Sequence, residues 1–196
     1  MVEHKWIEAA LKAFKKVMDK NSIPFWLEYG TQLGAVREHR IIPWDKDGDV
    51  GVFLADISLM KHCQKDFEAV GIMMAYQEGH AFVNYKINDR EWIAVLDVYT
   101  FTVEKHNGKK WLARVENDKI FDIRSPYIYY KEFRTIVFLN ERFNIPWKAE
   151  EALEFVYGKQ WRTPIEIKPE AYKLKGPTPQ ELNEYGRTGR KKWKDV

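Results

Sequence analysis

Four aspartates stand at positions where they could act together on a metal ion. Asp45, Asp47 and Asp49 occupy alternate positions of the segment 43–49. In an extended chain, alternate side chains share one face and lie about 6.6 Å apart. Carboxylates so close raise one another's pKa, and a divalent cation removes the cost of their repulsion. Because oxygen ligands suit hard cations, the segment predicts a Mg²⁺ or Mn²⁺ site that includes these three carboxylates.

Two other interpretations of this segment are open. Alternating aspartates also occur on the exposed face of a solvated strand. A calcium loop of about twelve residues starting at Asp45 would end at Asp56, but its glycine, Gly48, stands at position four rather than six. A solvated strand would be the simplest interpretation without two further features of the chain.

The first feature is Asp97, which lies inside the apolar run 92–99. Such a run predicts a strand that is buried on both faces. An unpaired carboxylate there is costly, so Asp97 needs a cation, a metal ion or several N–H donors beside it. A structural salt bridge would satisfy this need. The alternative is a second strand that adds the fourth carboxylate to the metal site.

The second feature is a glycine turn at Gly30-Thr31, between a predicted strand at 25–29 and a predicted helix at about 32–38. Glycine lets the backbone approach a ligand closely, and a helix amino terminus presents free N–H groups to phosphate. Thr31 adds a hydroxyl and Arg37 a guanidinium. We therefore predict that Gly30, Thr31 and Arg37 bind the phosphates of a donor.

The remaining pattern predicts a mixed α/β (α+β) fold, with a mixed sheet flanked by helices. Expected elements are a helix at 3–20, a strand at 47–54, a helix from Asp56 to Gly71, strands at 81–87 and 91–101, a hairpin at 107–108 leading into 111–115, extended segments at 127–130 and 133–139, and a helix at 149–157 that ends at Gly158. We expect one catalytic domain at 1–167 and a basic, partly extended tail at 168–196.

Composition limits the class of protein. Hydrophobic residues make up 45% and aromatic residues 15% of the chain, which is enough for a core. A net charge of +3 does not indicate nucleic-acid binding. The single cysteine, Cys63, excludes an internal disulfide and a cysteine-based zinc cluster. With no apolar run of about 18 residues and no leader pattern, we expect a cytoplasmic protein without membrane insertion; the tail allows peripheral contact with an anionic surface.

The segments 29–37 and 42–49 together resemble the signature of the LicD family. The likeness extends to 96–99 and to a closing segment at 157–164, so it covers roughly residues 25–164. The resemblance implies a nucleotidyltransferase fold. It also implies transfer of a phospho-alcohol, such as phosphocholine or ribitol phosphate, from a CDP-linked donor to a glycan or other hydroxyl.

On this hypothesis Asp47 and Asp49 hold one or two metal ions and Asp45 assists them. Asp97 contacts a metal ion or acts as the general base. Two alternatives use the same residues. One is transfer of a nucleoside monophosphate from a nucleoside triphosphate to a small molecule or protein, and the other is a nucleotide-binding module without catalysis.

Overall fold

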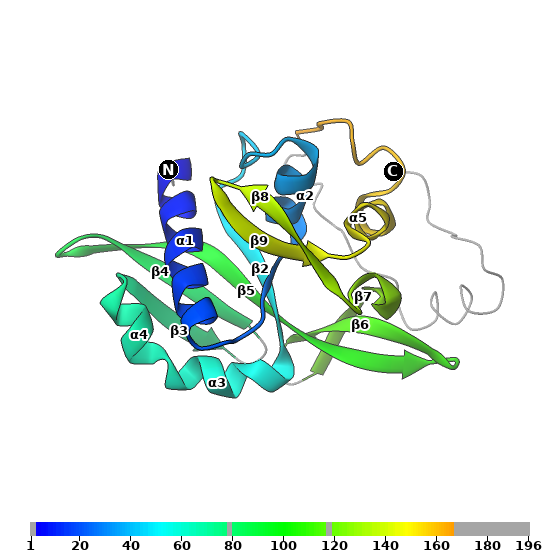
Figure 1. The fold of residues 1–196 in the computed structure, drawn as a ribbon, viewed down its shortest axis with the longest axis horizontal. Coiled ribbons are helices and arrows are strands. Elements are labelled where there is room, and N and C mark those ends of the chain that lie inside the picture. The colour runs from blue at the N-terminus through cyan, green and yellow to red at the C-terminus, as the bar shows by residue number, and fades with distance from the viewer. Residues whose placement is uncertain (1–2, 78–79, 117–118, 167–196) are drawn as a thin grey trace.

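The computed structural model describes residues 3–77, 80–116 and 119–166. Its centre is a mixed sheet in the order β1-β2-β5-β4-β3, and β6 and β7 extend from the far half of β5 (Figure 1). The strands are β1 Trp26–Leu27, β2 Gly48–Phe53, β3 Ile72–Gln77, β4 His80–Asn88, β5 Glu91–His106, β6 Lys109–Glu116 and β7 Lys119–Pro126. A separate hairpin pairs β8 Phe133–Phe138 with β9 Glu141–Pro146. The predicted tail at 168–196 lies outside the described residues.

The pairing of β2 with β5 is parallel, whereas the other pairings in the main sheet are antiparallel. Helix α1 (His4–Lys20) packs against one face of this sheet (Figure 1). Its apolar positions recur at helical spacing and are buried: Ile7, Ala10, Leu11, Phe14, Val17 and Met18. They belong to the same core as the buried Val50, Val52, Leu96 and Val98 of β2 and β5.

The other helices are α2 Tyr29–Arg37, α3 Ile57–His62, α4 Gln64–Ala69 and α5 Ala149–Tyr157, with short 3-10 helices at Leu54–Asp56 and Tyr127–Tyr129. No helix in the described ranges is long and apolar enough to cross a membrane. Together the elements form a mixed α/β fold whose sheet is flanked by helices, as predicted. Gly158 ends α5 with a φ of 83°, which also agrees with the prediction.

Four local predictions were wrong. The helix expected from Asp56 to Gly71 is two helices, because the backbone at Cys63 leaves the helical region. The segment 127–130, predicted to be extended, forms a 3-10 turn. The strand expected at 25–29 stops at Leu27, because Tyr29 has a φ of 43° and turns the chain into α2. The helix therefore begins three residues earlier than expected, and Gly30 and Thr31 lie in its first turn rather than before it. The segment 92–99 is buried only in its second half, since pairing with β2 begins at Leu96.

A second, aromatic core supports the start of α2. Trp26 is fully buried and its ring lies 4.9 Å from that of Phe53 and 5.1 Å from that of Phe133. Its indole N–H donates a hydrogen bond of 2.6 Å to Glu28, which is also fully buried. Because Glu28 immediately precedes α2, this core fixes the point at which the helix begins.

Candidate active site

Asp49 and Asp97 lie side by side on the one parallel strand pair of the main sheet in the described residues. They are register partners in β2 and β5, and in-register neighbours of a sheet point to the same face. That face is opposite to the one that α1 covers, because Val50 and Val98 point toward the α1 core. Asp49 is 9% exposed and the Asp97 side chain is 24% exposed. Asp97 is therefore only partly buried.

The Gly30-Thr31 turn holds Asp49 in place. The Asp49 backbone N–H donates to the Thr31 hydroxyl at 2.8 Å, and the Gly30 N–H donates to Asp49 Oδ2 at 3.1 Å. The Glu28 N–H donates to the Asp49 carbonyl, also at 3.1 Å. The start of α2 thus anchors a carboxylate in this structure. Binding of donor phosphate by Gly30 and Thr31 stays a prediction.

Asp45 converges on the same turn. A Cβ on Gly30 would lie 2.8 Å from Asp45 Oδ2 and 3.3 Å from Asp49 Oδ2, so only glycine leaves room for both carboxylates. Asp45 and Asp47 precede β2 and lie in a loop, and Asp47 is exposed. The alignment predicted for an extended chain is therefore wrong for these two residues. Even so, Asp45 and Asp49 lie beside the same glycine, and the charges of Asp45 and Asp47 act on Asp49.

Burial and neighbouring negative charge raise the pKa values of Asp45, Asp47 and Asp49. Burial, together with the charge of Asp47, raises the pKa of Asp45 to about 6. Although Asp47 is exposed, partial loss of its hydration raises its pKa, and the charge of Asp97 adds to this effect. For Asp49, burial and the other three carboxylates raise the pKa well above its usual value. The site thus concentrates negative charge that a cation would relieve.

The metal-free protein should lose thermal stability as the pH rises through about 6. The folded-state pKa of Asp45 is about 6 against an ordinary value of 3.8, so the folded protein binds the extra proton between these values. Stabilisation from that proton is present at low pH and is lost as the pH rises through the folded-state pKa. As the pH rises through this range, we expect the unaltered protein to lose about 1 kcal/mol of stability more than Asp45→Asn loses. This corresponds to about 2–4 °C in Tm. A Tm difference between the two proteins that stays constant with pH would contradict this expectation.

Asp97 has two polar neighbours that the sequence did not predict. The Tyr99 hydroxyl donates to Asp97 Oδ2 at 3.1 Å, and His80 Nε2 lies 3.6 Å from Asp97 Oδ1. Tyr99 is two positions further along β5, so alternation on the strand is a signal that could have identified it. His80 comes from the neighbouring strand β4, and only the register of the sheet reveals its position.

Aromatic rings and one arginine border the same carboxylates. The Tyr29 and Tyr99 rings lie 4.5 Å apart, and the Arg114 guanidinium lies 4.7 Å from the centre of the Tyr99 ring. Burial raises the pKa of Tyr99, and the charges of Asp49 and Asp97 raise it further. Tyr99 therefore stays protonated and remains a hydrogen-bond donor to Asp97.

The guanidinium of Arg37 already has hydrogen-bond partners in this structure. It donates to the adjacent Glu38 carboxylate and to the Trp161 carbonyl, the latter at 3.3 Å. Arg37 lies in the last turn of α2, about 9 Å along the axis from Thr31. Its positive charge partly opposes the rise in the pKa of Asp45, so Arg37 influences the site from a distance. A phosphate contact by Arg37 stays a prediction, and it requires release of Glu38.

The carboxylates of this site fit a hard divalent cation that takes some of its ligands from the protein and the others from a substrate. Among the described residues, no three His, Cys, Asp or Glu side chains come close enough to enclose a metal ion alone. Mg²⁺ commonly takes only one or two carboxylates and completes its shell with substrate phosphates and water. The neighbouring Asp49 and Asp97, with Asp47 at the exposed edge, offer such an incomplete set of oxygens.

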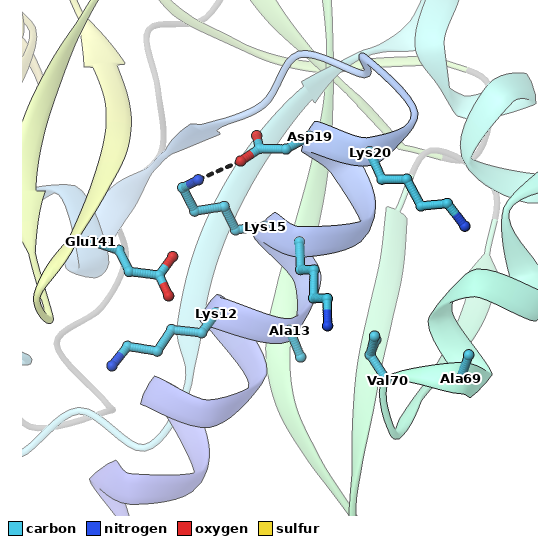
Figure 2. Close-up of a pocket in the computed structure, with 9 residues that line it drawn as sticks. Lys12, Ala13, Lys15, Asp19, Lys20, Ala69, Val70 and Glu141 are labelled. Carbon is cyan, nitrogen blue, oxygen red and sulfur yellow. Dashed lines mark hydrogen bonds and ion pairs between the residues drawn. The ribbon is translucent and has the colours of Figure 1, made fainter.

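A separate hollow of about 820 Å³ lies between α1, α4 and β9 (Figure 2). Its lining is Lys12, Ala13, Lys15, Lys16, Asp19, Lys20, Ala69, Val70 and Glu141. Three of its four lysines already pair with carboxylates, namely Lys12 with Glu8, Lys15 with Asp19 and Lys20 with Asp66. None of the candidate-site residues lines it. The hollow therefore does not form part of the candidate active site.

Comparisons with known proteins agree with the sequence motif. Residues 22–148 match the model of the family described as LicD/FKTN/FKRP, nucleotidyltransferase domain. Human ribitol-5-phosphate transferase FKTN is 27% identical over 158 residues, which is 79% of this chain and 33% of that protein. Mouse ribitol 5-phosphate transferase FKRP is 46% identical over 41 residues, or 21% of this chain and 8% of that protein.

The chain thus spans about a third of the length of the FKTN relatives that it matches. Among solved structures, ANT(2″)-Ia in complex with adenylyl-2″-tobramycin aligns with a TM-score of 0.46 and 15% identity, covering 92% of this chain and 85% of that chain. The matched range contains the strands of the main sheet and the four aspartates of the candidate site, but neither α1 nor α5. The chain belongs to the LicD/FKTN/FKRP nucleotidyltransferase-domain family.

Proposed function

We propose that this chain catalyses transfer of a phospho-alcohol from a CDP-activated donor to a hydroxyl acceptor, with Mg²⁺ or Mn²⁺ as cofactor. A phosphocholine-like or ribitol-phosphate-like group is the proposed cargo, and a glycan the proposed acceptor. The observation that carries the proposal is the pairing of Asp49 with Asp97 beside the Gly30-Thr31 turn. Relatives named ribitol-5-phosphate transferases support the choice of cargo.

The residues have distinct roles in this proposal. Asp49 is buried and held by three hydrogen bonds to Glu28, Gly30 and Thr31, so we assign it as the fixed ligand of the site. Asp47 is exposed and can approach the donor, while Asp45 adds negative charge behind them. A bound divalent cation would neutralise the phosphate charge that develops during transfer. Gly30 and Thr31 are proposed to seat the donor phosphates.

Asp97 is proposed to contact the divalent cation beside Asp49 and to accept the proton of the acceptor hydroxyl. One of its oxygens is held by Tyr99, and the carboxylate is partly exposed, so the other face can meet a substrate. The acceptor oxygen then forms a bond to the phosphorus that carries the alcohol. The bond from this phosphorus to the bridging oxygen breaks, and CMP leaves with that oxygen.

A second candidate is transfer of a nucleoside monophosphate from a nucleoside triphosphate. The family description as a nucleotidyltransferase domain favours it, and it would use the same carboxylates. The acceptor would then attack the α-phosphorus of the triphosphate, and pyrophosphate would leave. The two candidates therefore differ in the product that each releases.

Product analysis tests the proposal. CDP-choline, CDP-ribitol, CDP-glycerol and the common nucleoside triphosphates are each incubated with the protein, Mn²⁺ and hydroxyl acceptors. We expect CMP from a CDP-alcohol, no product with excess chelator, and no product with Asp97→Asn. Pyrophosphate from a triphosphate would favour the second candidate. Absence of both products with every donor, or full activity in chelator, would refute the proposed chemistry.

A further inference from the structure

His80 is a buried histidine whose position the proposed roles do not yet explain. Its side chain is 9% exposed, and its Nε2 has no hydrogen-bond partner among the described residues. The nearest carboxylate oxygen is Asp97 Oδ1, at 3.6 Å. A shift of about 0.4 Å would bring this pair into the ordinary range of a hydrogen bond.

Packing fixes the direction in which the imidazole points. His80 is the register partner of Tyr99, so both side chains lie on the face of the sheet that carries Asp97. Its ring lies 4.8 Å from the Tyr99 ring, nearly perpendicular to it, and 4.4 Å from the Phe82 ring. Held between two aromatic rings, the imidazole has little freedom to turn Nε2 away from Asp97.

We propose that His80 is a positioning residue which, together with Tyr99, holds the two oxygens of Asp97 in the orientation that divalent-cation binding requires. Tyr99 donates to Oδ2 and His80 is poised to donate to Oδ1. With one donor at each oxygen, the plane of the carboxylate is fixed and its remaining lone pairs are free for other ligands. This inference rests on the proposed function.

A purely apolar role would not require a histidine at this position. A leucine or phenylalanine would fill the space between Phe82 and Tyr99 without leaving a polar nitrogen unsatisfied, which costs roughly 1–3 kcal/mol. Hydrogen-bond partners of ligand carboxylates usually change metal affinity about 10–100-fold when they are removed. The unsatisfied Nε2 is therefore best explained by a hydrogen bond from His80 to Asp97 Oδ1 that forms when a ligand binds.

The test measures binding of Mn²⁺ alone, by electron paramagnetic resonance of the free ion. His80→Leu and His80→Asn remove the donor at the Nε2 position, whereas His80→Gln places an amide N–H near it. We expect Leu and Asn to weaken Mn²⁺ binding about 10-fold or more and Gln to stay within about threefold of the unaltered protein. Tyr99→Phe, which keeps the ring, should also weaken binding.

His106→Leu is the matched control. His106 also has a buried Nε2 without a partner among the described residues, but it lies nine positions after Asp97 in β5, about 30 Å along the strand. We expect it to leave the affinity for Mn²⁺ unchanged.

Three results would overturn the inference. If Asp97→Asn loses Mn²⁺ but His80→Leu binds it normally, His80 does not position Asp97, and the proposed function stands. Equal affinities of the Asn and Gln variants at position 80 would also refute the role of the donor, even if the leucine variant fails to fold. If neither the unaltered protein nor any variant binds Mn²⁺, the proposed cation site itself is wrong, and this inference is wrong with it.

Discussion

Replacing Asp49 by asparagine should reduce transfer by about 10³-fold or more while the fold is retained. Asp49 is the most buried of the four carboxylates, and its backbone anchors it to the start of α2. Asparagine keeps the shape and the oxygen that accepts from Gly30, but it removes the charge. Since burial and three neighbouring carboxylates raise the pKa of Asp49, the metal-free variant should be as stable as the unaltered protein or more stable.

Asp56→Asn is a suitable control for this experiment. Burial also raises the pKa of Asp56, but no other carboxylate contributes to that shift. We expect this variant to keep full activity and to show no Mn²⁺-dependent change in Tm beyond that of the unaltered protein. Turnover by Asp49→Asn within tenfold of normal would show that Asp49 is a structural residue and not part of the reaction centre.

Trp26→Ala should cause the largest loss of stability of any single change considered, about 3–5 kcal/mol or roughly 10 °C in Tm. The indole ring is fully buried among the rings of Phe53, Phe101, Tyr130 and Phe133. Its removal leaves a cavity and takes from the buried Glu28 a hydrogen bond of 2.6 Å. Thermal and urea unfolding measure the change, and Trp92→Ala, on a ring that is 38% exposed, should cost far less.

A double-mutant cycle with Gly51→Ala identifies the cause. A Cβ on Gly51 would lie 2.5 Å from the Trp26 Nε1, so alanine should cost about 1–3 kcal/mol in the unaltered protein. In the Trp26→Ala background that space is open, and the same change should cost almost nothing. Additive effects of the two substitutions would contradict the close packing of the indole over β2.

Periodicity and turn residues predicted those elements whose signals lie within a few neighbouring residues. The apolar spacing of residues 3–20 predicted α1 nearly to the residue, and Gly158 correctly marked the end of α5. The placement of Asp97 beside Asp49 was predicted from the cost of burying a carboxylate, although Asp97 is only partly buried in the structure. Residue spacing alone suggested that these carboxylates lie near one another, but it did not predict the two polar neighbours of Asp97.

The remaining features depend on contacts between distant segments. Asp45 and Asp47 lie in a loop, and no alternation rule describes how a loop folds back. His80 reaches Asp97 only because β4 and β5 pair in a particular register, which local sequence specifies weakly. Arg37 was expected to bind phosphate. In this structure its guanidinium donates to the carboxylate of Glu38, the next residue in the chain. Competition of this kind is visible only when both side chains have been placed.

The anchoring of Asp49 divides the site into a rigid part and an adaptable part. Both the N–H and the carbonyl of Asp49 are bonded to the residues that begin α2, so helix and strand move as one body at this point. Asp47 lies in the loop before β2, and its side chain is exposed. If the proposed function holds, the loop should accommodate differences in the size of the transferred group. Substitutions in the loop should then change the selection among donors more than substitutions in α2 do.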